Sequence, residues 1–424
     1  MGAPALEVAS RAARLGGVTR SLHGRRVVLA VTGSVAAYKS AALTRLLRAA
    51  GAEVDVVMTR SARRFVGDAT FSGLTGRPVL RTAFGPAAAG ELHVDVARRA
   101  ELVIVAPATA DVLARLATGR ADDLVTAIAL CATCPVLAAP AMHPSMWSHP
   151  ATRRNAELLA RDGRVTLVGP IAGEVASGDT GIGRMAEPET IAAAAASALT
   201  PRDLAGRHLV VSAGPTLEDL DPVRFLGNRS SGRMGFALAE RAAARGARVT
   251  LVTGPVALAT PPGVVRRDVR SALEMQAALD AALAASTGGA DALLMAAAVG
   301  DYRPATTHAA KLKRSAESLT IELQPNPDLL REIARRRTGP RPVLVGFAVE
   351  TGTDDEIAGY GQKKRVEKRV DVVVANPAAE SFGRSDNRAV LVTAEGARWL
   401  PVLEKTVLAD HILDAVVSML GGAE

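Results

Sequence analysis

The stretch RVVLAVTGSVAAYK, residues Arg26–Lys39, decides the fold class of the amino-terminal half of this chain. Its first part, Arg26–Thr32, is a run of aliphatic residues typical of a strand that is buried on both faces. Gly33 and Ser34 interrupt this run, and Val35–Ala50 then has the composition of a helix. A buried strand, a small-residue turn and a helix in this order predict the first βα unit of a parallel sheet.

The same alternation continues along the chain and restarts near residue 200. In the first half we expect further strands at Glu53–Met58, Leu102–Ala106 and Pro135–Ala139, with helices at Thr109–Leu116, Asp122–Ala132 and Glu189–Leu199. In the second half we expect strands at Arg207–Ser212, Arg248–Thr253, Ala292–Ala297, Pro342–Phe347 and Asp371–Ala375. The pattern predicts an α/β protein of two doubly wound, Rossmann-like domains with mostly parallel sheets. The expected boundaries are a flexible leader at 1–23, domains at 24–198 and 206–424, and a linker at 199–205.

Composition limits the classes of function. Hydrophobic residues make up 48% of the 424 residues and charged residues 22%, as in globular proteins. Aromatic residues make up only 3%, which argues against a base-stacking nucleic-acid surface. The net charge of +8 is dispersed along both halves and suits phosphorylated small substrates as well as a polyanion. Because no run is long enough to span a membrane and residues 1–23 lack a secretory core, we expect a cytoplasmic protein that binds neither nucleic acid nor membrane.

The two cysteines, Cys131 and Cys134, predict no disulfide framework. Their spacing also fits a redox pair or half of a zinc site, although the chain has no second pair. Because the motif runs into Pro135 and an apolar strand, we expect two buried, unreactive thiols.

Small and polar residues follow the predicted strands of the first half, where a doubly wound sheet binds its ligands. Thr32–Lys39 offers backbone N–H groups and the hydroxyl of Ser34 at a helix N-terminus, which suits a phosphate group. Ala106–Asp111 repeats this design, and Pro140–Trp147 adds the thioether of Met142. Each turn alone could be only a tight connection, and Met142 alone is more typical of a core residue.

The second half carries a similar series. Asp221–Gly235 contains hydroxyls, glycines and arginines directly before a predicted helix at Phe236–Arg245, which favours a phosphate cradle. The alternative is that its Asn and Ser side chains only cap the helix. Lys364 and Lys368 share one helix face at i, i+4 spacing and face either an anion or solvent. Further polar clusters follow at Ala296–Tyr302, Lys311–Lys313, Asn326–Asp328 and Gly346–Thr351.

The order GSVAAYK, TRS, a lone His93, APATAD and PAM before MW resembles the homo-oligomeric flavin-containing cysteine decarboxylases over residues 24–190. The resemblance implies an FMN-dependent phosphopantothenoylcysteine decarboxylase at 24–198 that forms trimers, with the flavin near a subunit interface. A lone histidine is more often structural, but the resemblance implies that His93 is the catalytic base. It also implies FMN contacts at Gly33, Ser34, Val35, Thr59, Ser61, Ala106, Pro107, Ala108, Thr109, Ala141 and Met142.

Two positions depart from that family's pattern. His143 stands where Asn usually follows Pro-Ala-Met, and its imidazole can still donate a hydrogen bond to a substrate carboxylate. Gly173–Met185 resembles the flap that covers the substrate, and Ser177 there stands where the family carries the proton-donor Cys. A Ser hydroxyl is a weaker acid than a thiol, whose pKa is about 8.5, so Glu174, Asp179 or water are alternative donors.

The ordered clusters of residues 205–420 resemble phosphopantothenate–cysteine ligases. The resemblance implies that Asn228 holds an acyl-cytidylate carbonyl and that Phe347 packs beside a cytosine. It implies substrate contacts at Ser230, Ser231, Gly232 and Arg233, where Arg233 replaces a common Lys. It implies CTP contacts at Met295, Ala296, Ala297, Asp301, Lys311, Asn326, Pro327, Asp328, Leu329, Phe347, Lys364 and Lys368, with Lys311 also catalytic. Mg2+ should bind through the CTP phosphates, because it prefers phosphate oxygens and water to an all-protein cage.

Together the two halves resemble bifunctional enzymes of coenzyme A biosynthesis. The substrates implied are phosphopantothenate, L-cysteine, CTP and phosphopantothenoylcysteine, and the assembly implied is a homo-oligomer in which the ligase domain forms dimers. An alternative keeps only the ligase active, with the flavin domain impaired or acting as a regulatory binding module. A dinucleotide-dependent oxidoreductase is disfavoured, because no GxGxxG with a downstream acidic residue occurs.

Overall fold

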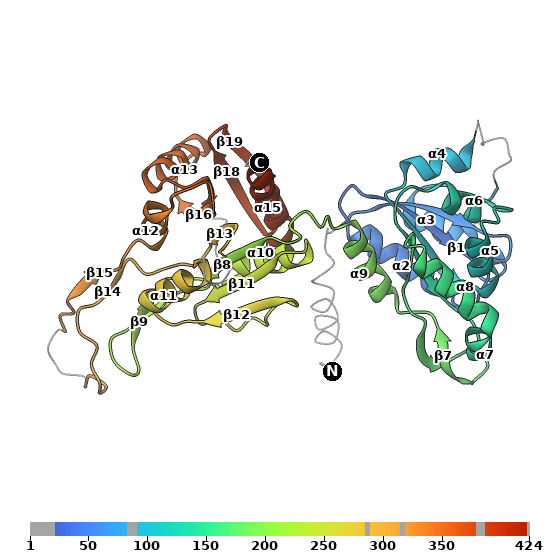
Figure 1. The fold of residues 1–424 in the computed structure, drawn as a ribbon, viewed down its shortest axis with the longest axis horizontal. Helices are drawn as coiled ribbons and strands as arrows, with labels where there is room; N and C mark the ends of the chain where they lie inside the picture. Colours follow the sequence, from blue (N-terminus) through green and yellow to red (C-terminus); the bar gives the residue numbers. More distant parts are fainter. Residues whose placement is uncertain (1–21, 83–90, 285–288, 314–318, 379–385, 422–424) are drawn as a thin grey trace, which may run out of the picture. The chain divides into compact units, whose positions relative to one another are not determined.

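The computed structural model describes residues 22–82, 91–284, 289–313, 319–378 and 386–421. The chain divides between Thr200 and Pro201 into two compact units, here called the first and second units (Figure 1). The predicted α/β class with mostly parallel sheets is confirmed in both units.

The first unit contains a five-stranded, fully parallel sheet in the order β2-β1-β3-β4-β5. Its strands are β1 (Arg26–Val31), β2 (Glu53–Met58), β3 (Leu102–Ala108), β4 (Val136–Pro140) and β5 (Val165–Leu167). This is the flavodoxin-like order, in which the chain reverses direction across the sheet between β1 and β3. A separate antiparallel hairpin, β6 (Ile171–Glu174) and β7 (Thr180–Arg184), follows the sheet.

Helices cover both faces of this sheet. One core contains buried residues of α2 (Ala37–Ala49) and α9 (Pro188–Leu199). The other face packs against α4 (Leu92–Arg99), α5 (Ala110–Thr118), α6 (Leu124–Cys131) and α8 (Pro150–Arg161). The unit also contains η1 (Ala62–Arg64), α3 (Asp68–Thr75) and α7 (Pro144–Ser148).

The second unit contains an eight-stranded sheet in the order β12-β11-β8-β13-β16-β17-β18-β19. The strands are β8 (His208–Ala213), β11 (Arg248–Thr253), β12 (Val264–Asp268), β13 (Ala292–Met295), β16 (Val343–Glu350), β17 (Val372–Pro377), β18 (Asp386–Thr393) and β19 (Gly396–Glu404). The first six in this spatial order are parallel and follow the Rossmann order, which reverses between β8 and β13. The antiparallel strands β18 and β19 were not predicted, because their short apolar runs carry no helix-linked repeat.

The second sheet is also covered on both faces. One core contains residues of α10 (Arg233–Ala244) and α15 (Lys405–Gly421). The other contains residues of α11 (Ala272–Leu283), α12 (Leu329–Arg336) and α13 (Asp354–Lys368). Two short antiparallel pairs, β9 (Leu217–Asp219) with β10 (Phe225–Gly227) and β14 (Tyr302–Pro304) with β15 (Leu323–Pro325), extend from the carboxyl ends of its strands.

The prediction of two buried thiols was wrong for Cys131. That residue ends α6 with its side chain exposed, whereas Cys134 is half-buried and burial raises the pKa of its thiol.

Arg245 joins the start of the second unit to its last helix. The guanidinium is 2% exposed and forms ion pairs with Asp203 (2.6 Å) and Asp414 (2.7 Å). The guanidinium donates hydrogen bonds to both carboxylates and to the Asp410 carbonyl, and losing several charge-assisted hydrogen bonds at once is costly even though Asp203 and Asp414 themselves are partly exposed.

We therefore expect Arg245→Met to lower the free energy of unfolding of the second unit by about 3 kcal/mol. The chain has two tryptophans, so a Trp147→Phe background leaves Trp399 as a fluorescence reporter of this unit during denaturant unfolding. The matched control is Arg267→Met, since Arg267 is exposed. An equal effect of both substitutions would contradict the role assigned to Arg245.

Candidate active sites

The loops that leave β1, β2 and β3 meet at the reversal point of the first sheet. The Thr32 hydroxyl donates to the Pro107 carbonyl (2.6 Å), and the Ser40 hydroxyl donates to the Ala106 carbonyl (2.7 Å). A Cβ at Gly33 would lie 2.4 Å from the Cβ of Ser61, so only glycine allows this close approach. The sequence motifs at Gly33–Val35, Thr59–Ser61 and Ala106–Thr109 are thus parts of one packed edge.

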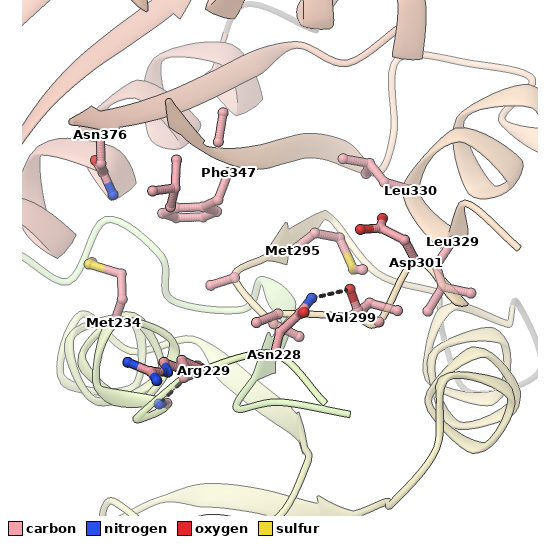
Figure 2. A pocket seen from close by; sticks show the side chains of 18 of the residues that line it. Asn228, Arg229, Met234, Met295, Val299, Asp301, Leu329, Leu330, Phe347 and Asn376 are labelled. Carbon is pink, nitrogen blue, oxygen red and sulfur yellow. Dashed lines mark hydrogen bonds between the residues drawn. The ribbon is translucent and has the colours of Figure 1, made fainter. Parts of the chain in front are cut away.

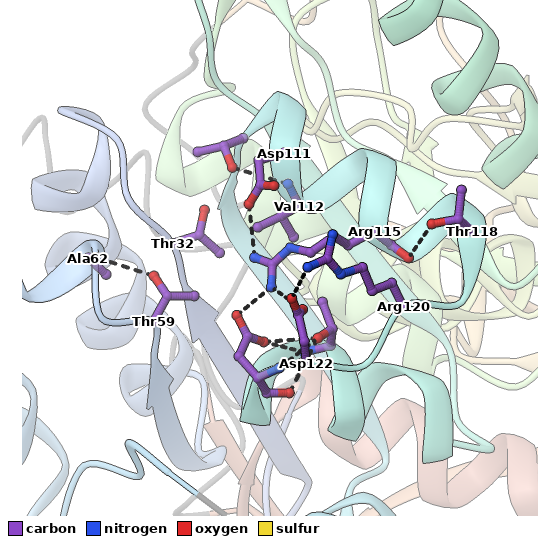
Figure 3. Close-up of polar contacts among 12 residues, drawn as sticks. Thr32, Thr59, Ala62, Asp111, Val112, Arg115, Thr118, Arg120 and Asp122 are labelled. Carbon is purple, nitrogen blue, oxygen red and sulfur yellow. Dashed lines mark hydrogen bonds and ion pairs between the residues drawn. The ribbon is translucent and has the colours of Figure 1, made fainter.

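Side-chain caps and an ion cluster fix the helices at this edge. Thr109 accepts a hydrogen bond from Val112 N (3.3 Å) at the start of α5. Figure 3 shows Arg115 of the same helix between Asp111 and Asp122, at 3.0 and 2.9 Å, and Arg115 also reaches Asp123 at 2.7 Å. Burial acts to lower the pKa of Arg115, but its hydrogen bonds to the carboxylates raise it overall. This cluster joins α5 to the start of α6 and holds the β3 exit in place.

A cavity of about 590 Å³ opens beside the N-terminus of α2. Helix α2 starts without a side-chain cap, although Ala37 N donates to the Ser34 carbonyl (2.9 Å) and Lys39 N to the Ala36 carbonyl (3.0 Å), so the positive end of the helix dipole is its main attraction for an anion. Of the predicted positions, the cavity brings together Ser34, Val35, Ala141, Met142, His143 and Ser177. Residues of the β6–β7 hairpin line its other side.

His143, Asp179 and Ser177 form one hydrogen-bonded group at the mouth of this cavity. The Nδ1 of His143 accepts from Ser145 N (3.2 Å), so the ring nitrogen that carries hydrogen is Nε2, which donates to Asp179 Oδ2 (2.9 Å). Ser177 Oγ donates to the same carboxylate oxygen (2.8 Å). The hydrogen bonds from His143 and then Ser177 lower the pKa of Asp179. His143 and Ser177, the two residues that depart from the family pattern, therefore form hydrogen bonds with the same carboxylate oxygen.

Other predicted positions of the first unit lie outside the cavity wall. Gly33, Thr59, Ser61 and Ala106–Thr109 support its edge without lining it. His93 lies half-buried on α4 and is also not among the lining residues. Within one chain, His93 is therefore not part of the cavity that His143 and Ser177 line.

The second unit contains a larger cavity, of about 830 Å³, at the reversal point between β8 and β13 (Figure 2). It collects nearly all predicted substrate and CTP positions of this half: Asn228, Ser230, Ser231, Gly232, Arg233, Met295, Ala296, Ala297, Asp301, Asn326, Pro327, Asp328, Leu329, Phe347, Lys364 and Lys368. Residues that are widely separated in sequence therefore meet beyond the carboxyl ends of β8, β13 and β16.

Hydrogen bonds hold the loops of this cavity. Asn228 Nδ2 donates to the Val299 carbonyl (2.9 Å), and Asn326 Nδ2 donates to the Gly300 carbonyl (2.8 Å). The hydroxyl of Ser212, at the end of β8, accepts from Ala297 N (3.2 Å). These contacts tie the loop after β13 to the loops before α10 and α12.

Lys364 and Lys368 of α13 both line the cavity. Lys364 Nζ donates to the Phe347 carbonyl (3.1 Å), and Lys368 lies 2.9 Å from Asp328 Oδ2. Burial, and next the charge of Lys368, lower the pKa of Lys364. Such a partly desolvated ammonium gains most from a bound anion.

Lys311 is the one predicted CTP position that the cavity does not contain. It is exposed on a segment that is fixed at Asp221, where Leu312 N donates to Asp221 Oδ2 (3.1 Å) and Arg224 donates to the Leu312 carbonyl (2.7 Å).

Three further polar residues line the cavity that sequence reasoning missed: Asn376, Asn387 and Lys405. Asn376 follows a predicted strand, so the strand-exit rule could have found it. Asn387 and Lys405 come from an antiparallel strand and a helix start, for which the sequence offers no comparable signal.

Comparison with known proteins identifies both halves. The model of the DNA/pantothenate metabolism flavoprotein C-terminal domain matches residues 204–420, and the flavoprotein model matches residues 16–200. Coenzyme A biosynthesis bifunctional proteins CoaBC are similar along nearly the whole chain. Those of Vibrio cholerae, Escherichia coli K12 and Mycobacterium tuberculosis are 43%, 42% and 45% identical, over 94% of this chain in each case. The matches cover 99%, 98% and 97% of the relatives. The chain belongs to the CoaBC family.

As a CoaBC protein, the chain is a bifunctional enzyme that joins a flavoprotein decarboxylase domain to a ligase domain, as predicted. The alternative of a single active half finds no support among these relatives. Within the described ranges, no helix combines the length and the apolar character needed to cross a membrane. The same ranges contain no group of three or more His, Cys, Asp or Glu side chains suited to a metal ion.

The close approach at Gly33 gives a test of the first site. Gly33→Ala should drive the β1 exit away from Ser61 and abolish flavin binding, while the rest of the sheet remains folded. Flavin absorbance of the purified protein and its circular dichroism measure the two properties. Gly73→Ala is the matched control, because a Cβ there meets no atom within 4 Å. If Gly33→Ala retained as much flavin as Gly73→Ala, the close approach at Gly33 would not be required for flavin binding.

Proposed function

We propose that the chain carries out two consecutive reactions of coenzyme A biosynthesis. The second unit joins phosphopantothenate to L-cysteine through an acyl-cytidylate formed from CTP, with release of pyrophosphate and then CMP. The first unit converts the resulting phosphopantothenoylcysteine to phosphopantetheine with loss of carbon dioxide. The observation that carries this proposal is that each unit contains its own cavity, lined in the second unit by nearly all the positions that the resemblance implies and in the first unit by six of them.

The first cavity suits FMN. The uncapped N-terminus of α2 and the hydroxyl of Ser34 would hold the phosphate, while Val35, Ala141 and Met142 offer apolar contacts. Bound FMN would supply a hydride acceptor, which no amino-acid side chain can provide. The close packing at Gly33 supports the same assignment, since it brings the exits of β1 and β2 together.

His143 is proposed to orient the substrate carboxylate through its Nε2–H. That group now donates to Asp179, so the substrate must displace or share this bond. Ser177 remains a weak acid, and its proton is already donated to Asp179. Asp179 is therefore proposed to position His143 and Ser177 at the cavity mouth, while the donor of the final proton stays open between Glu174, Asp179, Ser177 and water.

His93 is proposed to act as the base on a cavity of a neighbouring copy. Its absence from the lining of the cavity in its own chain and the expected trimer of flavin units support this arrangement. By the same reasoning, Lys311 is proposed to reach a ligase site only after its segment moves or a second copy docks. We accordingly propose a homo-oligomer, working in the cytoplasm on small-molecule substrates.

In the ligase unit, Phe347 is proposed to pack beside the cytosine and Asn228 to hold the acyl-cytidylate carbonyl while the cysteine amine attacks it. Asn228 would exchange its bond to the Val299 carbonyl for the ligand. Lys364 and Lys368 would balance the charge of the triphosphate. Mg2+ would arrive on the phosphates, because it prefers phosphate oxygens and water to an all-protein cage.

A coupled assay with each unit inactivated separately tests the proposal. Wild-type protein supplied with phosphopantothenate, CTP and cysteine should form CMP, carbon dioxide and phosphopantetheine. Asn228→Asp should stop product formation from phosphopantothenate but still convert supplied phosphopantothenoylcysteine. His93→Asn should accumulate phosphopantothenoylcysteine without carbon dioxide. Mass spectrometry separates these products, and formation of phosphopantothenoylcysteine as the final wild-type product would reject the decarboxylase half.

The lowered pKa of Lys364 predicts a pH dependence of CTP binding. In the free protein this ammonium loses its proton below the usual pH for lysine, and a bound triphosphate would raise its pKa again. CTP binding should therefore take up protons in the alkaline range between the pKa of Lys364 in the free protein and its higher pKa in the complex. Affinity should be constant below that range and fall as the pH rises through it.

Calorimetry at one alkaline pH, in buffers of different ionisation enthalpy, measures this uptake. Phosphate groups do not interfere there, because their second pKa is about 6. The uptake should disappear in Lys364→Met. A CTP affinity that rises with pH, or equal uptake in the variant, would contradict the assignment.

A further inference from the structure

Two arms of the second unit extend from the walls of the ligase cavity. The first arm is the β9–β10 hairpin, which ends at Gly227, directly before the cavity residue Asn228. The second arm, residues 302–313, begins with β14 directly after the cavity residue Asp301. Figure 1 shows β9 beside β14 and β15, so the two arms lie next to each other. A contact that fixes one arm against the other therefore also fixes its residues relative to the cavity.

The two arms are joined at their base and again farther from the cavity. At the base, Gly300 N donates to the Oγ1 of Thr216 (2.9 Å), and Thr216 is fully buried. Farther out, His308 N donates to the Leu220 carbonyl (2.9 Å). The second arm is therefore held against the first arm on the side of Lys311 that precedes it in the chain.

Asp221 and Arg224, in the turn of the first arm, hold the second arm at Leu312, the residue after Lys311. Leu312 N donates to Asp221 Oδ2 (3.1 Å), and Arg224 Nη2 donates to the Leu312 carbonyl (2.7 Å). The two side chains also bind each other, since Arg224 Nη2 donates to Asp221 Oδ2 (2.7 Å). A single ion pair thus binds both backbone polar groups of Leu312. We call this arrangement the Asp221–Arg224 clasp.

The Asp221 carboxylate has hydrogen-bond donors for both of its oxygens, although its side chain is 0% exposed. Oδ1 accepts from Val223 N (2.8 Å) and Arg224 N (2.9 Å), which shapes the turn of the first arm. Oδ2 accepts from the Arg224 guanidinium and from Leu312 N, which joins the turn to the second arm. Burial alone would raise the pKa of Asp221, but the hydrogen bonds from Val223, Arg224 and Leu312 lower it overall, so the carboxylate stays ionised.

We propose that Asp221 is a positioning residue of the ligase reaction, which acts by fixing the backbone beside Lys311. This role rests on the proposed function, because that function gives Lys311 its part in catalysis. Lys311 lies between two held residues, His308 and Leu312, and its own side chain is exposed. A lysine on a fixed backbone loses less conformational entropy when its ammonium reaches the reacting phosphates than a lysine on a free loop does.

The test compares Asp221→Asn with the matched control Asp371→Asn in the full chain. Asp371 also pairs with an arginine and accepts from a backbone N–H, but it precedes β17 at the amino end of the strand, away from the cavity. Asp221→Asn should lower the kcat of CMP formation about tenfold or more, the typical effect of losing a charge-assisted hydrogen bond. The calorimetric Kd for CTP should stay unchanged, since Lys311 does not line the cavity. Asp371→Asn should change neither quantity.

Lys311→Met supplies a comparison that a merely structural role of Asp221 would not affect. In the Lys311→Met background, Asp221→Asn should cause no further loss of kcat, because the side chain that it positions is already absent. An equal loss of kcat in both backgrounds would show that Asp221 acts independently of Lys311. That result, or no loss in either background, would reject the proposal.

Thr307→Val provides a second variant, whose folding should not be impaired. The exposed Thr307 hydroxyl donates to the Asp219 carbonyl (3.1 Å), so its loss loosens the second arm without disturbing a buried charge. It should lower kcat about threefold, and only when Lys311 is present.

Hydrogen–deuterium exchange of peptides within residues 305–312 measures the clasp without reference to activity. Exchange should be faster in Asp221→Asn than in the wild type and unchanged in Asp371→Asn, because Leu312 N loses its acceptor only in the first variant. Unchanged exchange in Asp221→Asn would reject the clasp. Failure of the wild type to form CMP in the coupled assay would instead reject the ligase function itself.

Discussion

The ligase cavity and the packed edge beside the first cavity depend on one constraint, the reversal of strand order beside the first strand of each sheet. In the first unit successive connections lead from β1 outward to β2 and then back to β3, and in the second they lead outward from β8 and then back to β13. Connections on opposite faces diverge at this point, so the loops above the strand ends leave a space between them. The parallel direction of the strands collects all these loops at one edge. Without the reversal, residues from four or more loops could not surround one ligand.

The two units use this common geometry for different chemistry. The first cavity joins apolar residues such as Met142 to a polar group at its mouth, where Asp179 holds both His143 and Ser177. The second cavity is lined by lysines, asparagines and two helix N-termini. An apolar cavity with few polar groups suits an isoalloxazine ring, whereas a cationic cavity suits substrates with several phosphates. The difference follows from the residues at the strand ends and not from the sheets themselves.

The sequence was sufficient for the class of fold because buried parallel strands are nearly continuous apolar runs, as in Arg26–Val31. It was also sufficient for most of the ligase cavity, since strand-exit residues such as Asn326 and Phe347 interrupt such runs. It failed for Asn387 and Lys405, whose positions depend on how an antiparallel edge and the last helix fold back. It could not show that His93 and Lys311 lie outside the cavities of their own chain, because that depends on tertiary arrangement.

Hydrogen–deuterium exchange of the full chain, with FMN and CTP added separately, tests the central claim most directly. The account predicts that FMN protects peptides containing residues 32–36 and 141–143, and that CTP protects peptides containing residues 295–301 and 326–330. Neither ligand should protect the peptides assigned to the other. Protection of the same peptides by both ligands, or of neither set, would contradict the assignment of one nucleotide site to each unit.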